Sequence, residues 1–200
     1  MTTTYPTTPI ARAVLPSSRA VTVGLMVGFA LLTALAAQVT IPIPGTPVPV
    51  TGQTFAVLLT GAALGSRAGA GSQAIYWMMG AMGLPFYADA TGGWEIATGA
   101  TAGYLVGFIV AAWVVGALAE RGKDRTVASA IPAFLAGNAV IYLIGVPWLL
   151  VSVEAFTSLP EAIAAGLTPF IIGDIVKIVA AGLLLPAAWH LADRLRPGSV

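Results

Sequence analysis

Six stretches of this chain are apolar enough to lie within a lipid bilayer, and together they use most of its 200 residues. They fall at roughly residues 19–38, 50–66, 69–84, 99–119, 127–152 and 168–191. A typical soluble domain carries about 25% charged residues, whereas this sequence carries 8%. We therefore predict an all-α membrane protein in which residues 19–191 form one compact domain of six transmembrane helices, flanked by segments at 1–18 and 192–200.

The basic residues predict how this domain lies in the membrane. Six spans place both termini on one side, together with the connections near residues 67 and 120–126. All basic residues except Lys177 fall on that side: Arg12, Arg19, Arg67, Arg121, Lys123, Arg125, Arg194 and Arg196. The opposite connections carry acids but no Lys or Arg. By the positive-inside rule the basic side is cytoplasmic, so we predict cytoplasmic N and C termini.

The composition also excludes several classes of function. A net charge of +1 without a basic run argues against nucleic acid as a partner. With no cysteine and His190 as the single histidine, we expect no disulfide and no metal site. Motifs of nucleotide-binding loops, serine hydrolases and zinc proteases are absent. We therefore predict that the chain is not an enzyme and has no cofactor, so that any ATP hydrolysis belongs to other subunits.

Asp174 and Lys177 are the ionisable residues that fall inside a predicted span rather than at its edge. Each costs about 2.5–3.5 kcal/mol at the centre of a membrane helix, so some contact must offset them. Because they are three residues apart, they share one helix face. At 1.5 Å per residue from Thr168, they lie about 9 and 13 Å below the outer edge. Two interpretations stay open: a structural salt bridge, or a carboxylate and an ammonium that bind a polar ligand.

Five further polar residues are candidates for the same cavity. Gln53 lies near the outer end of the second span, Asp89 in the loop after the third, and Tyr104 near the outer start of the fourth. Asn138 and Tyr142 are four residues apart on the fifth span and therefore share a face. A buried amide between helices can bind a ligand or simply connect two helices, so both roles remain open for Asn138.

Two features of the outer connections bear on access to such a cavity. Prolines at positions 42, 44, 47 and 49 predict a stiff, extended first outer loop, which acts as a lid or as a plain connector. The aromatic residues Phe86, Tyr87, Trp94 and Trp148 are expected at the outer interface. Some of them could instead stack on a ligand.

Several ordered motifs together resemble one known family. They are Pro49-Val-Thr-Gly-Gln-Thr, Gly65-Ser-Arg-Ala-Gly, Gly80-Ala-Met-Gly-Leu-Pro-Phe-Tyr-Ala, Gly99-Ala-Thr-Ala-Gly-Tyr and Pro169-Phe-Ile-Ile-Gly-Asp-Ile-Val-Lys. Over about residues 20–190 the chain resembles the BioY family, the substrate-binding S component of biotin transporters of the energy-coupling factor (ECF) type. The resemblance implies high-affinity capture of biotin from the outside and its uptake across the cytoplasmic membrane of a prokaryote.

The resemblance also implies partners and residue roles. A transmembrane coupling subunit and two ATPase subunits would complete the transporter, although some family members occur without dedicated partners. Asp174 and Lys177 would contact the ureido ring of biotin. Asp89 falls where family members place a polar, often amide, residue, so an acid there departs from the pattern. Ala30 and Ala34 match the positions that face the coupling subunit.

The chemistry of biotin agrees with these residues. Its ureido group has two N–H donors and one carbonyl acceptor, which suit a carboxylate and an ammonium on one face. The sequence does not single out a partner for the valerate carboxylate. Two alternatives remain: an S component for another small vitamin, or a non-transport membrane protein in which Asp174 and Lys177 form a structural salt bridge.

Overall fold

The computed structural model describes residues 8–16 and 18–195, which are largely helical. Its helices are α1 (Ile10–Val14), α2 (Arg19–Ala37), α3 (Gln53–Leu64), α4 (Ser66–Ala81), α5 (Trp94–Thr98), α6 (Ala102–Ala119), α7 (Val127–Ser152), α8 (Leu159–Gly166) and α9 (Ile171–Leu195). Short 3-10 turns lie at η1 (Ala88–Ala90) and η2 (Thr168–Phe170), and β1 (Thr40–Ile41) pairs antiparallel with β2 (Val50–Thr51). Residues 1–7 of the predicted N-terminal segment, residue 17, and residues 196–200 of the predicted tail, with Arg196, lie outside the described residues.

Four stretches of the described chain are long and apolar enough to cross a membrane. They are Arg19–Ala37, Ala102–Ala119, Val127–Ser152 and Leu159–Arg194. The second and third predicted spans correspond to α3 and α4, which have 12 and 16 residues. At 1.5 Å per residue these helices are about 18 and 24 Å long, less than the hydrocarbon core of about 30 Å. The mostly helical fold with several helices of membrane-spanning length is confirmed, whereas six full-length spans are not.

The chain turns between α3 and α4 at a single residue, Gly65. Its φ of 84° lies in the left-handed region that favours glycine. The connection predicted near Arg67 thus lies two residues earlier, because α4 begins at Ser66 and includes Arg67 in its first turn. The carboxylate of Glu120, at the end of α6, accepts hydrogen bonds from the Ser66 backbone N–H at 2.8 Å and from the Ser66 hydroxyl. An acid at the N-terminus of α4 stabilises this tight turn.

The last predicted span, at residues 168–191, begins earlier than the corresponding helix of the structure. The structure places α9 at Ile171–Leu195, preceded by η2 and by the separate helix α8, which the sequence analysis does not predict. A proline in the first turn of α8 fits the rule that proline is tolerated where its missing N–H would be unbonded anyway. By contrast, the predicted boundaries of 127–152 agree with those of α7.

Helix α6 is central to the packing. It contacts α7 most extensively and also packs against α3 and α4. Gly103 and Gly107 lie against α7, and a Cβ atom at Gly103 would come within 2.2 Å of the Trp148 Cβ. Gly116 likewise lies against the turn between α3 and α4, where its own Cβ would be 2.3 Å from the Ser66 backbone nitrogen. Small residues thus let the backbones approach closely, as is typical of helices in lipid.

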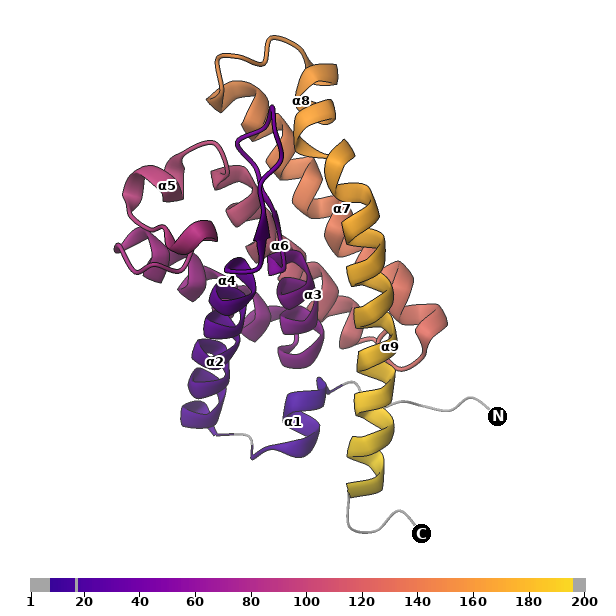
Figure 1. The fold of residues 1–200 in the computed structure, drawn as a ribbon. Coiled ribbons are helices and arrows are strands. Elements are labelled where there is room, and N and C mark those ends of the chain that lie inside the picture. The colour runs from indigo at the N-terminus through magenta and orange to yellow at the C-terminus, as the bar shows by residue number, and fades with distance from the viewer. Residues whose placement is uncertain (1–7, 17, 196–200) are drawn as a thin grey trace.

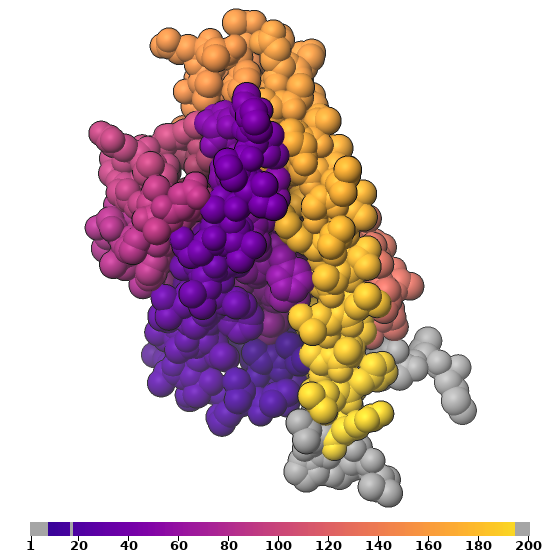
Figure 2. Space-filling view, in the orientation of Figure 1, coloured from indigo at the N-terminus to yellow at the C-terminus, as the bar shows by residue number. Residues whose placement is uncertain are grey.

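The two ends of the molecule differ. Figure 1 shows α1 and the C-terminal end of α9 at one end, while α8 and the loop between β1 and β2 lie at the other. In Figure 2 the hairpin segment runs beside α8 and the upper part of α9. The hairpin corresponds to the proline-rich loop, which is extended as predicted and closes on itself through the pairs Thr40 with Thr51 and Ile41 with Val50.

At the α1 end, a buried polar cluster fixes α9 to the connection between α6 and α7. The Trp189 indole N–H donates to Asp124 Oδ2 at 2.7 Å, and the Arg125 guanidinium lies 3.2 Å from Asp124 Oδ1. Burial raises the pKa of the Asp124 carboxyl above its ordinary value, against the opposing effects of Trp189 and Arg125. These contacts hold the C-terminal half of α9 against the connection between α6 and α7.

The close approach at Gly116 can be tested by adding one methyl group. We expect Gly116→Ala to lower the free energy of unfolding by about 1–3 kcal/mol, because the methyl group would meet backbone atoms that cannot move aside. Gly28→Ala on α2 is the matched control, since a Cβ atom there meets no atom within 4 Å. Denaturant titration in detergent micelles measures both variants. Equal stability of the two would contradict the packing described here.

Candidate ligand-binding site

A cavity of about 410 Å³ lies between the hairpin, the N-terminal end of α3, the loops around η1 and α5, and helices α6, α7 and α9. Its volume lies within the range of about 300–1,000 Å³ usual for small-molecule sites. Apolar side chains of Leu105, Phe108, Ile141 and Phe170 form much of its wall. A small ligand with an apolar body would fit such a cavity, and its polar groups would have to meet the polar lining residues.

Asp174, in the first turn of α9, is 3% exposed and receives four hydrogen bonds. Its Oδ1 accepts from the Thr54 hydroxyl at 3.3 Å and from the Lys177 ammonium at 3.2 Å. Its Oδ2 accepts from the Asn138 amide at 3.1 Å and from the Tyr142 hydroxyl. The donors come from α3, α7 and α9, so a single carboxylate connects three helices. A buried carboxylate needs such donors to offset the loss of hydration.

Lys177 completes this cluster from the next turn of α9. Its Nζ donates to the Thr54 hydroxyl at 3.0 Å and to Asp174 Oδ1 at 3.2 Å, and its side chain is 18% exposed. An ammonium has three N–H donors, and these two bonds leave one for another acceptor. Because Lys177 lines the cavity, that acceptor can belong to a ligand.

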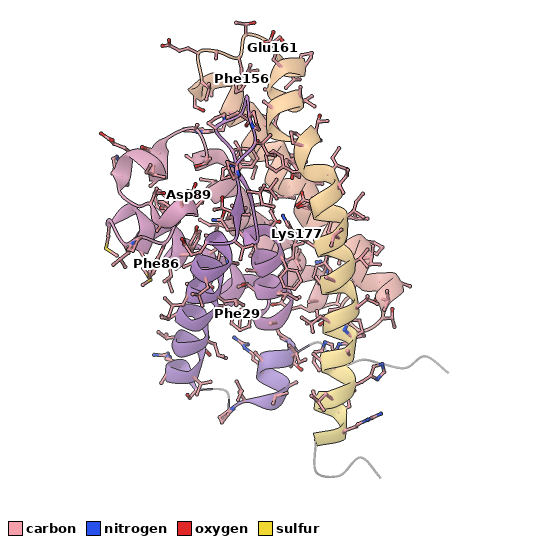
Figure 3. The ribbon with its side chains drawn as sticks, in the orientation of Figure 1. Phe29, Phe86, Asp89, Phe156, Glu161 and Lys177 are labelled. Carbon is pink, nitrogen blue, oxygen red and sulfur yellow. The ribbon has the colours of Figure 1, made fainter. Side chains whose placement is uncertain are left out.

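The opposite face of α9 is apolar and exposed. Ile172, Ile175 and Val176 are all more than half exposed, as expected for side chains that contact lipid. Asp174 and Lys177 instead line the cavity, and Figure 3 shows Lys177 on the side of α9 that faces the hairpin. The acid and the amine therefore pair with each other and also border a space that a ligand can enter.

Gln53, the first residue of α3, lies on the cavity wall beside Thr51. Its amide oxygen accepts from the Thr51 hydroxyl at 2.7 Å, and its amide nitrogen donates to the Tyr76 hydroxyl of α4. The Tyr76 ring contacts the Tyr87 ring edge to face, with centroids 5.7 Å apart. The hydrogen bonds to Thr51 and Tyr76 thus fix the orientation of the Gln53 amide in the cavity wall.

Tyr104 and Tyr142 line the cavity from α6 and α7, and their rings meet edge to face at 6.3 Å. The Tyr104 hydroxyl donates to the Gly166 carbonyl of α8 at 2.8 Å. The centroid of the Phe170 ring lies 6.4 Å from that of the Tyr142 ring. Aromatic walls of this kind suit the flat apolar part of a small ligand.

Asp89 and Glu95 lie at the exposed margin of the cavity. Asp89 has a φ of 57°, in the left-handed region that Asp tolerates better than most residues. Gln38 at the end of α2 holds this loop, since its amide nitrogen donates to the Tyr87 carbonyl at 3.1 Å and its amide oxygen accepts from the Ala90 N–H at 3.0 Å. Asp89 is therefore presented on an ordered loop, whereas Glu95 lies in the first turn of α5.

The structure brings most of the predicted site residues together. Asp174, Lys177, Gln53, Tyr104, Tyr142 and Asp89 all line the cavity. Asn138 lies behind Asp174 instead, and its Oδ1 has no hydrogen-bond partner among the described residues. Its position makes it a support for the carboxylate. Within residues 8–16 and 18–195, no group of three or more His, Cys, Asp or Glu could hold a metal ion.

Other lining residues are not singled out as cavity residues by the sequence analysis. Thr54 bridges Asp174 and Lys177, yet a threonine in an apolar run gives no signal. Phe170 is four residues before Asp174, so helical spacing could have indicated it. Tyr87 was expected at the membrane interface, with stacking on a ligand left open; it is 3% exposed and lines the cavity, and its hydroxyl donates to the Trp77 carbonyl. Burial raises the pKa of Tyr87 to about 12, so the phenol stays neutral.

The positions predicted to contact a partner subunit need correction. Ala30 and Ala34 on α2 are 1% and 5% exposed and pack inside the chain, so in this structure neither reaches the surface. Ala30 and Ala34 were assigned to the partner contact as small residues spaced by four. A second pair of small residues with that spacing, Gly24 and Gly28, lies on the exposed side of α2. Spacing alone cannot tell these two faces apart, because alanine and glycine suit both internal and external helix contacts.

The cluster around Asp174 predicts a specific stability effect. We expect Lys177→Met to lower the free energy of unfolding by about 1–3 kcal/mol, because it leaves a buried carboxylate without its cation. Adding Asp174→Asn should recover part of this loss, since the neutral amide no longer needs the cation. The control is Lys123→Met in the exposed turn after α6. A Lys177→Met protein as stable as the parent would contradict the ion pair.

The sequence of this chain is similar to those of known proteins. Residues 9–194 match the sequence pattern of the BioY family. The chain is 39% identical over 156 residues to "Biotin transporter BioY" of Thermotoga maritima, covering 78% of this chain and 88% of that one. It is 40% identical over 164 residues to "Biotin transporter BioY" of Rhodobacter capsulatus, covering 78% and 85%.

The fold also matches a solved structure described as the S-component for biotin from an ECF-type ABC transporter. The TM-score is 0.77, and the match covers 88% of this chain and 95% of the other. At 20% sequence identity, this likeness supports the fold.

Proposed function

This chain belongs to the BioY family, and from that membership together with its cavity we infer that it captures biotin outside the cell and serves its uptake as the S component of an ECF transporter. The observation that carries this proposal is the Asp174 and Lys177 pair, which borders a cavity of about 410 Å³. Biotin matches both parts of the site, because it joins a polar ureido group to an apolar ring and chain.

The ureido group meets the polar end of the cavity. One of its N–H groups donates to the Asp174 carboxylate, while its carbonyl accepts from the Lys177 ammonium. Thr54 donates to the same Asp174 oxygen as Lys177, so binding exchanges one of these internal hydrogen bonds for one to the ligand. Asn138 and Tyr142 keep the other oxygen in place. The fused ring lies against the wall of Phe108, Ile141 and Phe170.

The membrane topology follows from the charge pattern and the helix arrangement. Helices α2, α3, α4, α6, α7 and α9 form the six-helix membrane domain at residues 19–191, in the cell membrane of a prokaryote. Residues 1–18 and 192–200 lie in the cytoplasm, which agrees with α1 and the end of α9 lying at one end of the molecule (Figure 1). The cavity is then near the outer face, where biotin arrives.

Energy for uptake comes from other chains. The BioY family consists of transporter components rather than enzymes, and the solved structure with the same fold is an S-component of an ECF-type ABC transporter. A coupling subunit in the membrane and two ATPase subunits therefore complete the transporter. This chain supplies the recognition of the substrate.

Binding of biotin can be measured directly by isothermal titration of the purified protein. We expect saturable heat with biotin at micromolar concentration and none with riboflavin or thiamine. Asp174→Asn should weaken binding at least tenfold, because the amide is uncharged and replaces one of the two acceptor oxygens with an N–H donor. Glu154→Gln, in the exposed loop after α7, is the matched control and should bind normally. Heat with another vitamin but not with biotin would instead identify a different S component.

Dependence on partner subunits can be tested in proteoliposomes. The chain alone should bind biotin but not concentrate it, because it lacks any nucleotide-binding motif. Addition of the coupling subunit and both ATPases should give uptake that requires ATP. Accumulation of biotin by the chain alone would show that it does not depend on these partners.

A further inference from the structure

The charged side chains that line the cavity are distributed unevenly. They are Asp174, Lys177, Asp89 and Glu95. Asp174 and Lys177 form an ion pair at the buried side and neutralise each other. Asp89 and Glu95 are exposed, and neither forms an ion pair within residues 8–16 and 18–195. The exposed margin of the cavity, formed by these two acids and referred to here as the acidic margin, therefore carries two uncompensated negative charges.

No basic side chain elsewhere balances the acidic margin. Lys177 is the one Lys, Arg or His among the described residues that line the cavity. The sequence itself contains no Lys, Arg or His between Arg67 and Arg121, the segment that includes both acids. The other basic residues lie in the segments assigned to the opposite side of the membrane. A carboxylate placed at the acidic margin would thus meet negative charge with no cation beside it.

The proposed function determines which end of the ligand reaches this margin. With the ureido ring at Asp174 and Lys177 on α9, the chain attached to the ring is directed toward the other lining residues, which include Asp89 in η1 and Glu95 in α5. In Figure 3, Lys177 and Asp89 lie on opposite sides of the hairpin segment. A ligand whose ring contacts Lys177 and the buried Asp174 would therefore extend its chain toward the exposed acids.

We propose that the acidic margin makes this chain prefer biotin whose carboxyl group is joined to a neutral or cationic group, as in an amide, over free biotin with its ionised carboxylate. This inference rests on the proposed function, because it names the form of biotin that the same cavity binds best. Like charges oppose binding of the free acid. An amide avoids this repulsion, and the Thr101 hydroxyl at the start of α6 lines the cavity as a neutral hydrogen-bonding group.

The size of the preference follows from the exposure of the acids. Charges in contact with water interact weakly and are screened over about 8–10 Å at physiological salt. We therefore expect the primary amide of biotin to bind about three- to tenfold more tightly than biotin at low ionic strength. The difference should shrink at about 0.5 M salt, since screening removes the repulsion. A biotin amide that ends in an ammonium group should bind at least as tightly as the primary amide.

The test compares these three ligands by isothermal titration with the full-length protein. In the double variant Asp89→Asn with Glu95→Gln, the preference for the amide should fall below about twofold, because free biotin binds more tightly. Glu154→Gln with Glu161→Gln removes two acids from outer segments that do not line the cavity, and should keep the preference. The salt dependence of the preference for the amide, measured on the unmodified protein, tests the same repulsion without any variant.

The outcomes separate this inference from the proposed function. If the unmodified protein binds free biotin as tightly as the amide, or if the preference persists in the Asp89 and Glu95 variant, the acidic margin does not select the ligand while biotin capture stands. If none of the three compounds binds, the proposed function itself fails, and this inference fails with it.

Discussion

A carboxylate inside a membrane domain is tolerated only when its oxygens are hydrogen-bonded, and the organisation of this site follows from that constraint at Asp174. Its two oxygens accept from Thr54, Lys177, Asn138 and Tyr142. These donors tie α3 and α7 to the first turn of α9, so the helices that surround the cavity share one polar centre. The chain thus holds a hydrophilic site in an apolar domain without exposing a charge to lipid.

The same pair explains why a purely structural role is the weaker interpretation. A salt bridge that served only to join helices would be most stable with no space beside it, because water or a void weakens packing. Here Lys177 keeps a donor toward a cavity whose walls are otherwise aromatic and aliphatic. The cluster of Asp124, Arg125 and Trp189 at the other end of α9 is also polar, but it joins α9 to the connection between α6 and α7 and does not line this cavity.

Much of this site could be predicted from the sequence, for physical reasons that also set the limit. Charged residues in apolar runs are rare, so Asp174 and Lys177 stand out, and a spacing of four places Asn138 and Tyr142 on one face. Residues whose role depends on tertiary contacts give no such signal. Thr54 is recognised only when α3 lies beside α9, and the burial of Ala30 and Ala34 depends on how α2 is rotated. The turn at Gly65 and the helix α8 were likewise set by local packing.

The central claim is that Asp174 and Lys177 hold the ureido ring of biotin, and a structure of the protein determined with biotin bound tests it most directly. The account predicts the ureido ring within hydrogen-bonding distance of the Asp174 carboxylate and the Lys177 ammonium, with the fused ring against Phe108, Ile141 and Phe170. Biotin bound elsewhere, with the cluster around Asp174 unchanged and the cavity empty, would contradict it.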